Sequence, residues 1–178
     1  MRSGDFDLDQ AIRKVPDFPK AGILFYDLTS ILTDPPAFNY CIEALAESCR
    51  ALGPAALVGV EARGFLFAAP VAARLGLPLL LVRKKGKLPG RRASKSFALE
   101  YGTDTIEVHA DDAARFPTAV LIDDLVATGG TLEAACELLA EQGCRVKGIS
   151  CVVGLPFLKY AEKLDPIRVK TLIDYRSE

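Results

Sequence analysis

Short, continuous apolar runs alternate with longer segments of helical periodicity along most of the chain. A continuous apolar run bounded by turn residues predicts a strand buried on both faces, and apolar positions three to four residues apart predict a helix. The predicted strands cover residues 57–61, 78–83, 119–123 and 145–153. The predicted helices cover residues 35–52, 64–75 and 130–142. Such strands in alternation with helices predict an α/β fold, a parallel twisted sheet with helices on both faces.

Proline and glycine mark the ends of these helices. Asp34 precedes Pro35, an arrangement typical of a capped helix start. Glycine closes helices because it adopts the left-handed conformation without strain. The predicted helices should therefore end at Gly53, Gly76 and Gly143.

Three segments depart from the alternation. Residues 84–96 (KKGKLPGRRASKS) are polar and basic, and with the alternating stretch 105–109 they predict a long loop on two-stranded stems. Residues 18–29 precede the first regular unit. Residues 154–178 are poorly informative, and they either form a last strand or pack against a partner.

Composition narrows the functional classes. Half of the residues are hydrophobic, a quarter are charged, and the net charge is −1, which gives no general bias toward nucleic acid or membrane. We expect no signal peptide and no membrane span, and hence a cytoplasmic protein. The five cysteines form no CxxC pair and His109 is the only histidine, which argues against a zinc site and for reduced cysteines.

The stretch AVLIDDLVATGGTLEAA, residues 119–135, carries the clearest chemistry. Asp123 and Asp124 should lie at the carboxyl end of a strand, where open α/β sheets bind ligands. The small-residue turn that follows leads into a helix N-terminus, which attracts a phosphate, and its glycines let the backbone approach closely. The carboxylates would repel that phosphate but can accept hydrogen bonds from ribose hydroxyls, so a sugar phosphate fits both halves. The alternative is a capped helix with glycines for turn geometry alone.

Several motifs together resemble one enzyme family. VLIDDLVATGGT resembles the phosphoribosyl-pyrophosphate (PRPP) motif of type I phosphoribosyltransferases. FPKAGILFYDLTSILTDP, VEARGFLFAAPVA, VRKKGKLPG and LEYGTD resemble the adenine phosphoribosyltransferases among them, over most of residues 16–143. The resemblance implies transfer of the 5-phosphoribosyl group from PRPP to adenine in purine salvage, with AMP and pyrophosphate as products. It also implies Mg²⁺ carried by PRPP without a direct protein ligand, and a homodimer.

The same resemblance implies a single domain over residues 1–178. Residues 1–33 would form an N-terminal arm and base hood, and residues 84–104 a flexible loop. The residues that it places on the ribose and 5′-phosphate are Asp123, Asp124, Ala127, Thr128, Gly129, Gly130 and Thr131.

Positive charge is expected at the pyrophosphate. Arg63 follows a predicted strand end, and the resemblance gives it a catalytic role as a leaving-group contact; the alternative is a surface arginine before a helix. The basic run would act as a lid over a polyanionic ligand, in its own site or in the neighbouring subunit's; the alternatives are a solvated face or a nucleic-acid patch. The implied pyrophosphate residues are Ala62, Arg63, Arg83, Lys84 and Lys87.

The base site rests on two further stretches. Glu100 would accept or share the purine proton, with Tyr101 in the lid; the alternative is an isolated exposed glutamate. Leu24, Phe25 and Tyr26 would bind adenine through backbone groups; the alternative is an ordinary packing arm. The chain departs from the family pattern here, because Tyr26 stands where arginine is common, and Phe97 replaces a common aromatic hydroxyl.

Two rival functions stay open on the sequence alone. One is a phosphoribosyltransferase for hypoxanthine, xanthine or orotate, against which the hood and LEYG argue. The other is a PRPP- or purine-sensing regulator on the same fold. No segment remains for a DNA-binding helix pair, which favours the enzyme.

Overall fold

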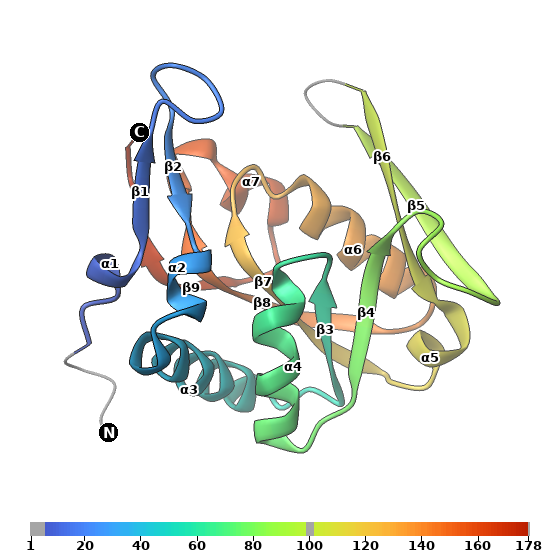
Figure 1. The fold of residues 1–178 in the computed structure, drawn as a ribbon. Coiled ribbons are helices and arrows are strands. Elements are labelled where there is room, and N and C mark those ends of the chain that lie inside the picture. The colour runs from blue at the N-terminus through green and yellow to red at the C-terminus, as the bar shows by residue number, and fades with distance from the viewer. Residues whose placement is uncertain (1–5, 99–101, 178) are drawn as a thin grey trace.

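The computed structural model describes residues 6–98 and 102–177. Its centre is a seven-stranded sheet in the order β5-β6-β4-β3-β7-β8-β9 (Figure 1). These strands are β3 (Ala56–Val60), β4 (Leu79–Lys84), β5 (Arg92–Ala98), β6 (Thr103–His109), β7 (Thr118–Val126), β8 (Arg145–Gly154) and β9 (Val169–Asp174). Neighbours from β4 to β9 through β3 are parallel, whereas β6 pairs antiparallel with both β4 and β5.

Helices cover both faces of the sheet, as predicted. The helices are α1 (Leu8–Ala11), α2 (Thr29–Leu32), α3 (Pro35–Leu52), α4 (Gly64–Leu75), α5 (Ala110–Ala114), α6 (Gly130–Glu141) and α7 (Tyr160–Leu164), with a 3₁₀ turn at Pro156–Leu158. Alternate strand residues feed two separate cores. Val58 and Leu121 pack in the core that contains α6, whereas Leu57 and Val120 pack in the core that contains α3 and α4.

The predicted helix ends are confirmed. Asp34 caps α3 by accepting a hydrogen bond from the Ala37 N–H, and Gly53 and Gly76 close α3 and α4 with φ values of 54° and 64°. Gly143, with φ 82°, follows α6. The last strand that the C-terminal segment allowed is also present, as β9.

Two sequence predictions need correction. β7 does not end at Asp123, because pairing with β8 continues as far as Val126 opposite Gly154. The basic segment is only partly a loop, since β5 takes its second half and pairs with β6 along its whole length. Ala93 and Phe97 of β5 pack against the core that contains α6, and this alternate burial makes the segment a strand despite its charge.

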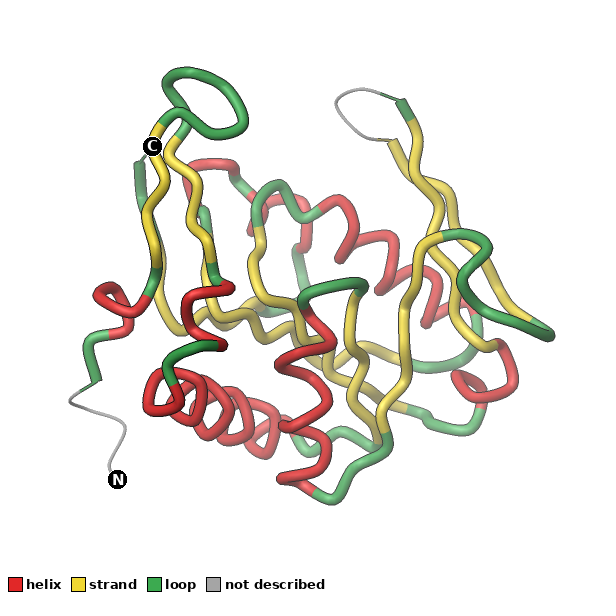
Figure 2. Tube along the Cα trace, in the orientation of Figure 1, coloured by secondary structure: helices red, strands yellow, loops and turns green. Residues whose placement is uncertain are grey.

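A small N-terminal hairpin stands beside the main sheet. β1 (Arg13–Pro16) pairs antiparallel with β2 (Leu24–Asp27). Figure 2 shows the hairpin and the β5–β6 pair rising on opposite sides of the loops that follow β3 and β7. Among the described helices, none has the length and apolar character needed to cross a bilayer.

Candidate active site

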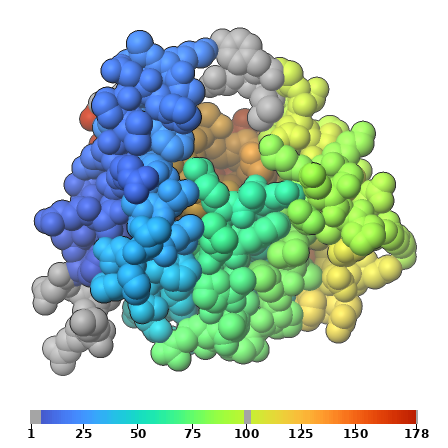
Figure 3. All heavy atoms as spheres, viewed as in Figure 1, coloured from blue at the N-terminus to red at the C-terminus, as the bar shows by residue number. Residues whose placement is uncertain are grey.

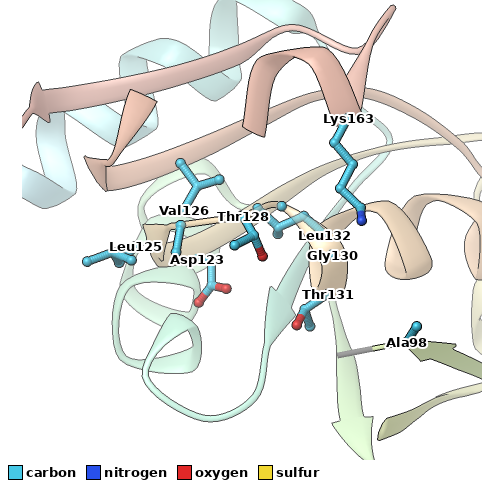
Figure 4. Close-up of a pocket in the computed structure, with 11 residues that line it drawn as sticks. Ala98, Asp123, Leu125, Val126, Thr128, Gly130, Thr131, Leu132 and Lys163 are labelled. Carbon is cyan, nitrogen blue, oxygen red and sulfur yellow. The ribbon is translucent and has the colours of Figure 1, made fainter. Parts of the chain in front are cut away.

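A pocket of about 770 Å³ lies at the carboxyl end of β7 (Figure 4). It is lined by Ala98, Asp123, Leu125, Val126, Ala127, Thr128, Gly129, Gly130, Thr131, Leu132 and Lys163. Six of the seven residues predicted to hold ribose and 5′-phosphate are in this set. Asp124 is the exception, and its side chain is buried.

Two glycines with different roles lie in the loop from β7 into α6. Gly129 has φ 83°, and a Cβ there would lie 3.3 Å from Leu164. Gly130 has no such constraint, since a Cβ would meet nothing nearer than Phe97 and Thr128 at 4.0 Å. Its missing side chain leaves the backbone at the α6 N-terminus open, where unpaired N–H groups favour an anion.

The acidic pair is held from the α4 side. A Cβ on Gly64, the first residue of α4, would lie 2.6 Å from Asp123 Oδ1 and 3.0 Å from the Ile122 carbonyl oxygen, so only glycine permits this contact. Asp123 Oδ1 also accepts a hydrogen bond of 2.9 Å from the Asp124 N–H. Burial, and then the charge of Asp124, raise the pKa of Asp123 well above its ordinary value.

Arg63 lies next to this pair. Its Nε is 2.7 Å from Asp124 Oδ2, and its side chain stays 42% exposed while that of Asp124 is 6% exposed. Burial raises the pKa of Asp124, and the Arg63 charge opposes the rise. The contact is an ion pair and not an aligned hydrogen bond, since within the described chain Asp124 Oδ2 accepts none. Asp124, predicted to contact ribose, and Arg63, predicted to contact pyrophosphate, are thus adjacent. Ala62 precedes Arg63 in the same turn.

Glu61 holds the other predicted pyrophosphate residues in place. It accepts hydrogen bonds from Arg83 Nε and Nη2, each 3.3 Å, and from the Lys84 N–H at 2.8 Å. Arg83 Nη1 donates to the Lys87 carbonyl at 3.1 Å, and Lys84 Nζ lies 3.8 Å from Asp104. None of the residues predicted to bind pyrophosphate lines the pocket: Ala62, Arg63, Arg83, Lys84 and Lys87. The predicted adenine residues Leu24, Phe25 and Tyr26 lie outside its lining as well.

The basic segment beyond them is largely paired. Arg91 contacts Asp111, and Arg92 contacts the buried Glu107. Lys95 reaches Glu137 and Glu141 of α6, at 2.8 and 2.6 Å. A run that reads as concentrated positive charge in the sequence is therefore balanced by acids from β6, α5 and α6.

Tyr26 of the predicted base hood turns its ring away from solvent. The ring stacks on that of Tyr175, with centroids 3.8 Å apart and planes 12° apart, and Tyr26 is 6% exposed. Phe25 instead packs edge-on against Phe18, which is half exposed. The side chain of Tyr26 is therefore occupied by its packing against Tyr175. Figure 3 shows the surface hollowed between this hairpin and the β5–β6 side, with the β7–α6 region at the floor.

Two predicted residues, Glu100 and Tyr101, lie outside the described residues. Ala98, the last described residue before them, lines the pocket. Lys163 also lines the pocket, although it comes from the C-terminal segment, where no sequence motif marks it. Within the described ranges, no group of three or more His, Cys, Asp or Glu side chains is arranged to hold a metal ion.

Comparisons with known proteins agree with one another. The model of the phosphoribosyl transferase domain matches residues 27–175. An adenine phosphoribosyltransferase of Treponema denticola is 53% identical over 171 residues, which are 96% of this chain and 90% of the relative. The solved adenine phosphoribosyltransferase of Thermoanaerobacter pseudethanolicus has a TM-score of 0.87 and 43% identity, covering 94% of this chain and 98% of that one. That of Saccharomyces cerevisiae, complexed with an imino-altritol bisphosphate and adenine, has a TM-score of 0.84 and 36% identity, covering 93% and 96%.

Proposed function

The chain belongs to the phosphoribosyl transferase domain family, and we propose that the pocket after β7 is the PRPP site of an adenine phosphoribosyltransferase. The enzyme transfers the 5-phosphoribosyl group of PRPP to adenine and yields AMP and pyrophosphate. The single observation that supports this placement best is the pocket itself, which joins the carboxylate of Asp123 to a glycine loop at a helix N-terminus.

Each end of PRPP has chemistry to match. Residues 127–131 offer backbone N–H groups and the hydroxyls of Thr128 and Thr131 to the 5′-phosphate. Asp123 accepts hydrogen bonds from ribose hydroxyls, and a bound Mg²⁺–PRPP complex would favour its ionised form against the burial that raises its pKa. Magnesium enters with PRPP as part of the substrate and lowers the charge of the pyrophosphate.

Arg63 would stabilise the leaving group. As the bond from C1′ to the pyrophosphate oxygen breaks, negative charge grows on that oxygen. A guanidinium beside it therefore stabilises the transition state more than the bound substrate. In the structure Arg63 is held by Asp124, 2.7 Å away, and half exposed. Asp124, the neighbour of Asp123 in the pocket lining, therefore orients the guanidinium, and its exposed part can share its charge with pyrophosphate.

The base arrives from the hood side. Backbone groups of residues 24–26 would accept from the adenine amino group and donate to a ring nitrogen. The purine nitrogen forms its bond to C1′ and loses its proton. On the sequence motif alone, we assign the carboxylate of Glu100 as the acceptor of this proton. The resemblance also supports a homodimer in the cytoplasm.

A base-selectivity assay tests the function. Purified protein is given Mg²⁺, PRPP and one labelled base, either adenine, hypoxanthine or guanine, and nucleotide formation is measured. AMP should form with a kcat/KM at least about a hundredfold above the other bases, because a site built on hydrogen bonds rejects a base that leaves them unpaired. Equal use of hypoxanthine, or no nucleotide at all, would refute the assignment.

A further inference from the structure

Lys163 is the one positively charged side chain among the described residues that line the pocket, and its amino group points toward the loop of residues 127–131 (Figure 4). We propose that Lys163 binds the 5′-phosphate of PRPP and AMP and so makes α7 part of the phosphate site. This inference rests on the proposed function and adds a residue that the motifs do not contain.

The packing of α7 fixes Lys163 over the loop. Tyr160 and Leu164, one helical turn apart, are buried at 7% and 3% exposure. Both pack on the loop, since a Cβ placed at Gly129 would be 3.4 Å from Tyr160 and 3.3 Å from Leu164. Lys163 lies on the neighbouring face of the same turn, so the contact that anchors α7 also carries the lysine to the pocket rim.

Lys163 supplies the positive charge that the rest of the pocket lining lacks. The lining contains one carboxylate, on Asp123, and otherwise only neutral groups besides Lys163. Backbone N–H groups and hydroxyls at the start of the 12-residue α6 supply partial charges only. A phosphate ester carries nearly two negative charges at neutral pH, so a full positive charge beside the loop supplies what the loop lacks.

Strand order decides which end of the substrate Lys163 meets. β7 has β3 on one side and β8 on the other. Arg63 follows β3, whereas α7 follows β8. Lys163 and Arg63 therefore lie on opposite sides of the loop, and Lys163 belongs with the 5′-phosphate while Arg63 belongs with the pyrophosphate.

The present partner of Lys163 does not prevent this contact. Its Nζ lies 3.5 Å from Glu133 Oε2, and the two side chains are 42% and 40% exposed. An exposed pair at this distance is weak and screened by salt. A phosphate in the loop offers the ammonium group shorter, charge-assisted hydrogen bonds.

The test compares Lys163→Gln and Lys163→Arg with Lys159→Gln, a control at an exposed lysine outside the pocket lining. Calorimetry measures AMP binding, and steady-state kinetics give the KM for PRPP, for adenine and, in the reverse reaction at saturating AMP, for pyrophosphate. Lys163→Gln should weaken AMP binding and raise the PRPP KM by about five- to thirtyfold, the effect of losing one charge-assisted contact. Adenine KM and pyrophosphate KM should stay within about twofold, Lys163→Arg should recover most of the loss, and Lys159→Gln should match wild type.

The outcomes separate this inference from the function on which it rests. If wild type makes no AMP, the proposed function fails. If wild type is active but Lys163→Gln binds AMP normally, the lysine has no part in the phosphate site. If Lys163→Gln raises the KM for pyrophosphate and keeps its AMP affinity, Lys163 binds the other end of the substrate and the proposal is overturned. Circular dichroism and a thermal melt check that the fold of each variant is retained.

Discussion

Of the two neighbouring glycines at the α6 N-terminus, we expect Gly130 to matter for ligand binding and Gly129 for the stability of the fold. Gly130→Ala adds a Cβ into open space, so the fold should keep its melting temperature. The added methyl group would stand where a phosphate oxygen approaches, and we expect the PRPP KM to rise about tenfold or more while adenine KM changes little.

Gly129→Ala is the matched comparison. Its φ of 83° and its 3.3 Å contact with Leu164 should lower the free energy of unfolding by about 1–3 kcal/mol. Thermal melts and PRPP kinetics on both variants check the pair. Normal PRPP kinetics in a folded Gly130→Ala protein would show that no ligand approaches this loop closely.

We expect the carboxylate of Asp123 to lower the stability of the folded protein while it strengthens PRPP binding. A folded-state pKa above the ordinary carboxyl value means that the folded protein holds a proton longer than the unfolded chain does. Stability therefore falls as pH rises from the ordinary value of about 3.9 through the raised one, and the loss persists at neutral pH. Without ligand, Asp123→Asn should melt higher at pH 7, by about 2–4 °C for each kcal/mol removed, and PRPP affinity should drop.

The difference between Asp123→Asn and wild type should shrink as the pH falls to about 3, because below the ordinary value of about 3.9 the wild-type carboxyl becomes protonated in both states. Glu47→Gln, at an exposed acid on α3, controls for the loss of one negative charge and should leave the melting temperature unchanged. A lower melting temperature for Asp123→Asn at pH 7 would contradict the account of a buried, costly carboxylate.

Glu100 carries a prediction from the sequence motif alone. Glu100→Gln keeps the shape of the side chain but cannot take the purine proton, so kcat should fall by about 10²–10⁴-fold with adenine binding nearly intact. Single-turnover rates at saturating PRPP measure the chemical step. A wild-type rate would remove Glu100 from the catalytic residues and leave positioning and Arg63 to account for the reaction.

At the scale of elements, the C-terminal segment packs on the N-terminal hairpin of β1 and β2, which we propose as the base hood. Tyr175 stacks on Tyr26 of β2, and its hydroxyl donates a 2.6 Å hydrogen bond to Asp9, which also pairs with Lys14 of β1 at 2.7 Å. Tyr175→Ala should loosen the hairpin and raise adenine KM about two- to tenfold, in line with the worth of one aromatic pair, while PRPP KM stays constant.

Tyr175→Phe keeps the stack and loses only the bond to Asp9, so its adenine KM should lie near wild type. Kinetics for both substrates, with thermal melts, separate a hood effect from general destabilisation. Equal increases in both KM values for Tyr175→Ala would mean that the segment supports the whole fold and not the base site.

Local pattern predicted most elements, and the exceptions have physical causes. Caps at Asp34 and Gly53 act within a few residues of sequence, so they are visible without the structure. The charges of residues 84–96 predict a loop there, whereas pairing with β6 and the partial burial of Phe97 make residues 92–98 a strand. β7 runs past Asp123 because β8 continues beside it, which local sequence does not record.

At the scale of the whole molecule, strand order assembles the site from distant segments. The sequence predicted the loop of residues 127–131 because all its parts are contiguous. It could not predict the Arg63–Asp124 pair or the position of Lys163, since both depend on β3 and β8 flanking β7. Contacts between segments that are far apart along the chain carry no local signal, which is why the contact between Arg63 and Asp124 and the position of Lys163 emerge only from the fold.

The central claim is that the β7–α6 loop holds the phosphate of the substrate and that the hood holds its base. A crystal structure of the protein with AMP tests it most directly, because AMP contains both groups. We predict phosphate oxygens within about 3 Å of the backbone N–H groups of residues 128–131, and the adenine ring against the backbone of residues 24–26. A phosphate bound instead on the basic segment of residues 84–96, with the loop after β7 empty, would contradict the account.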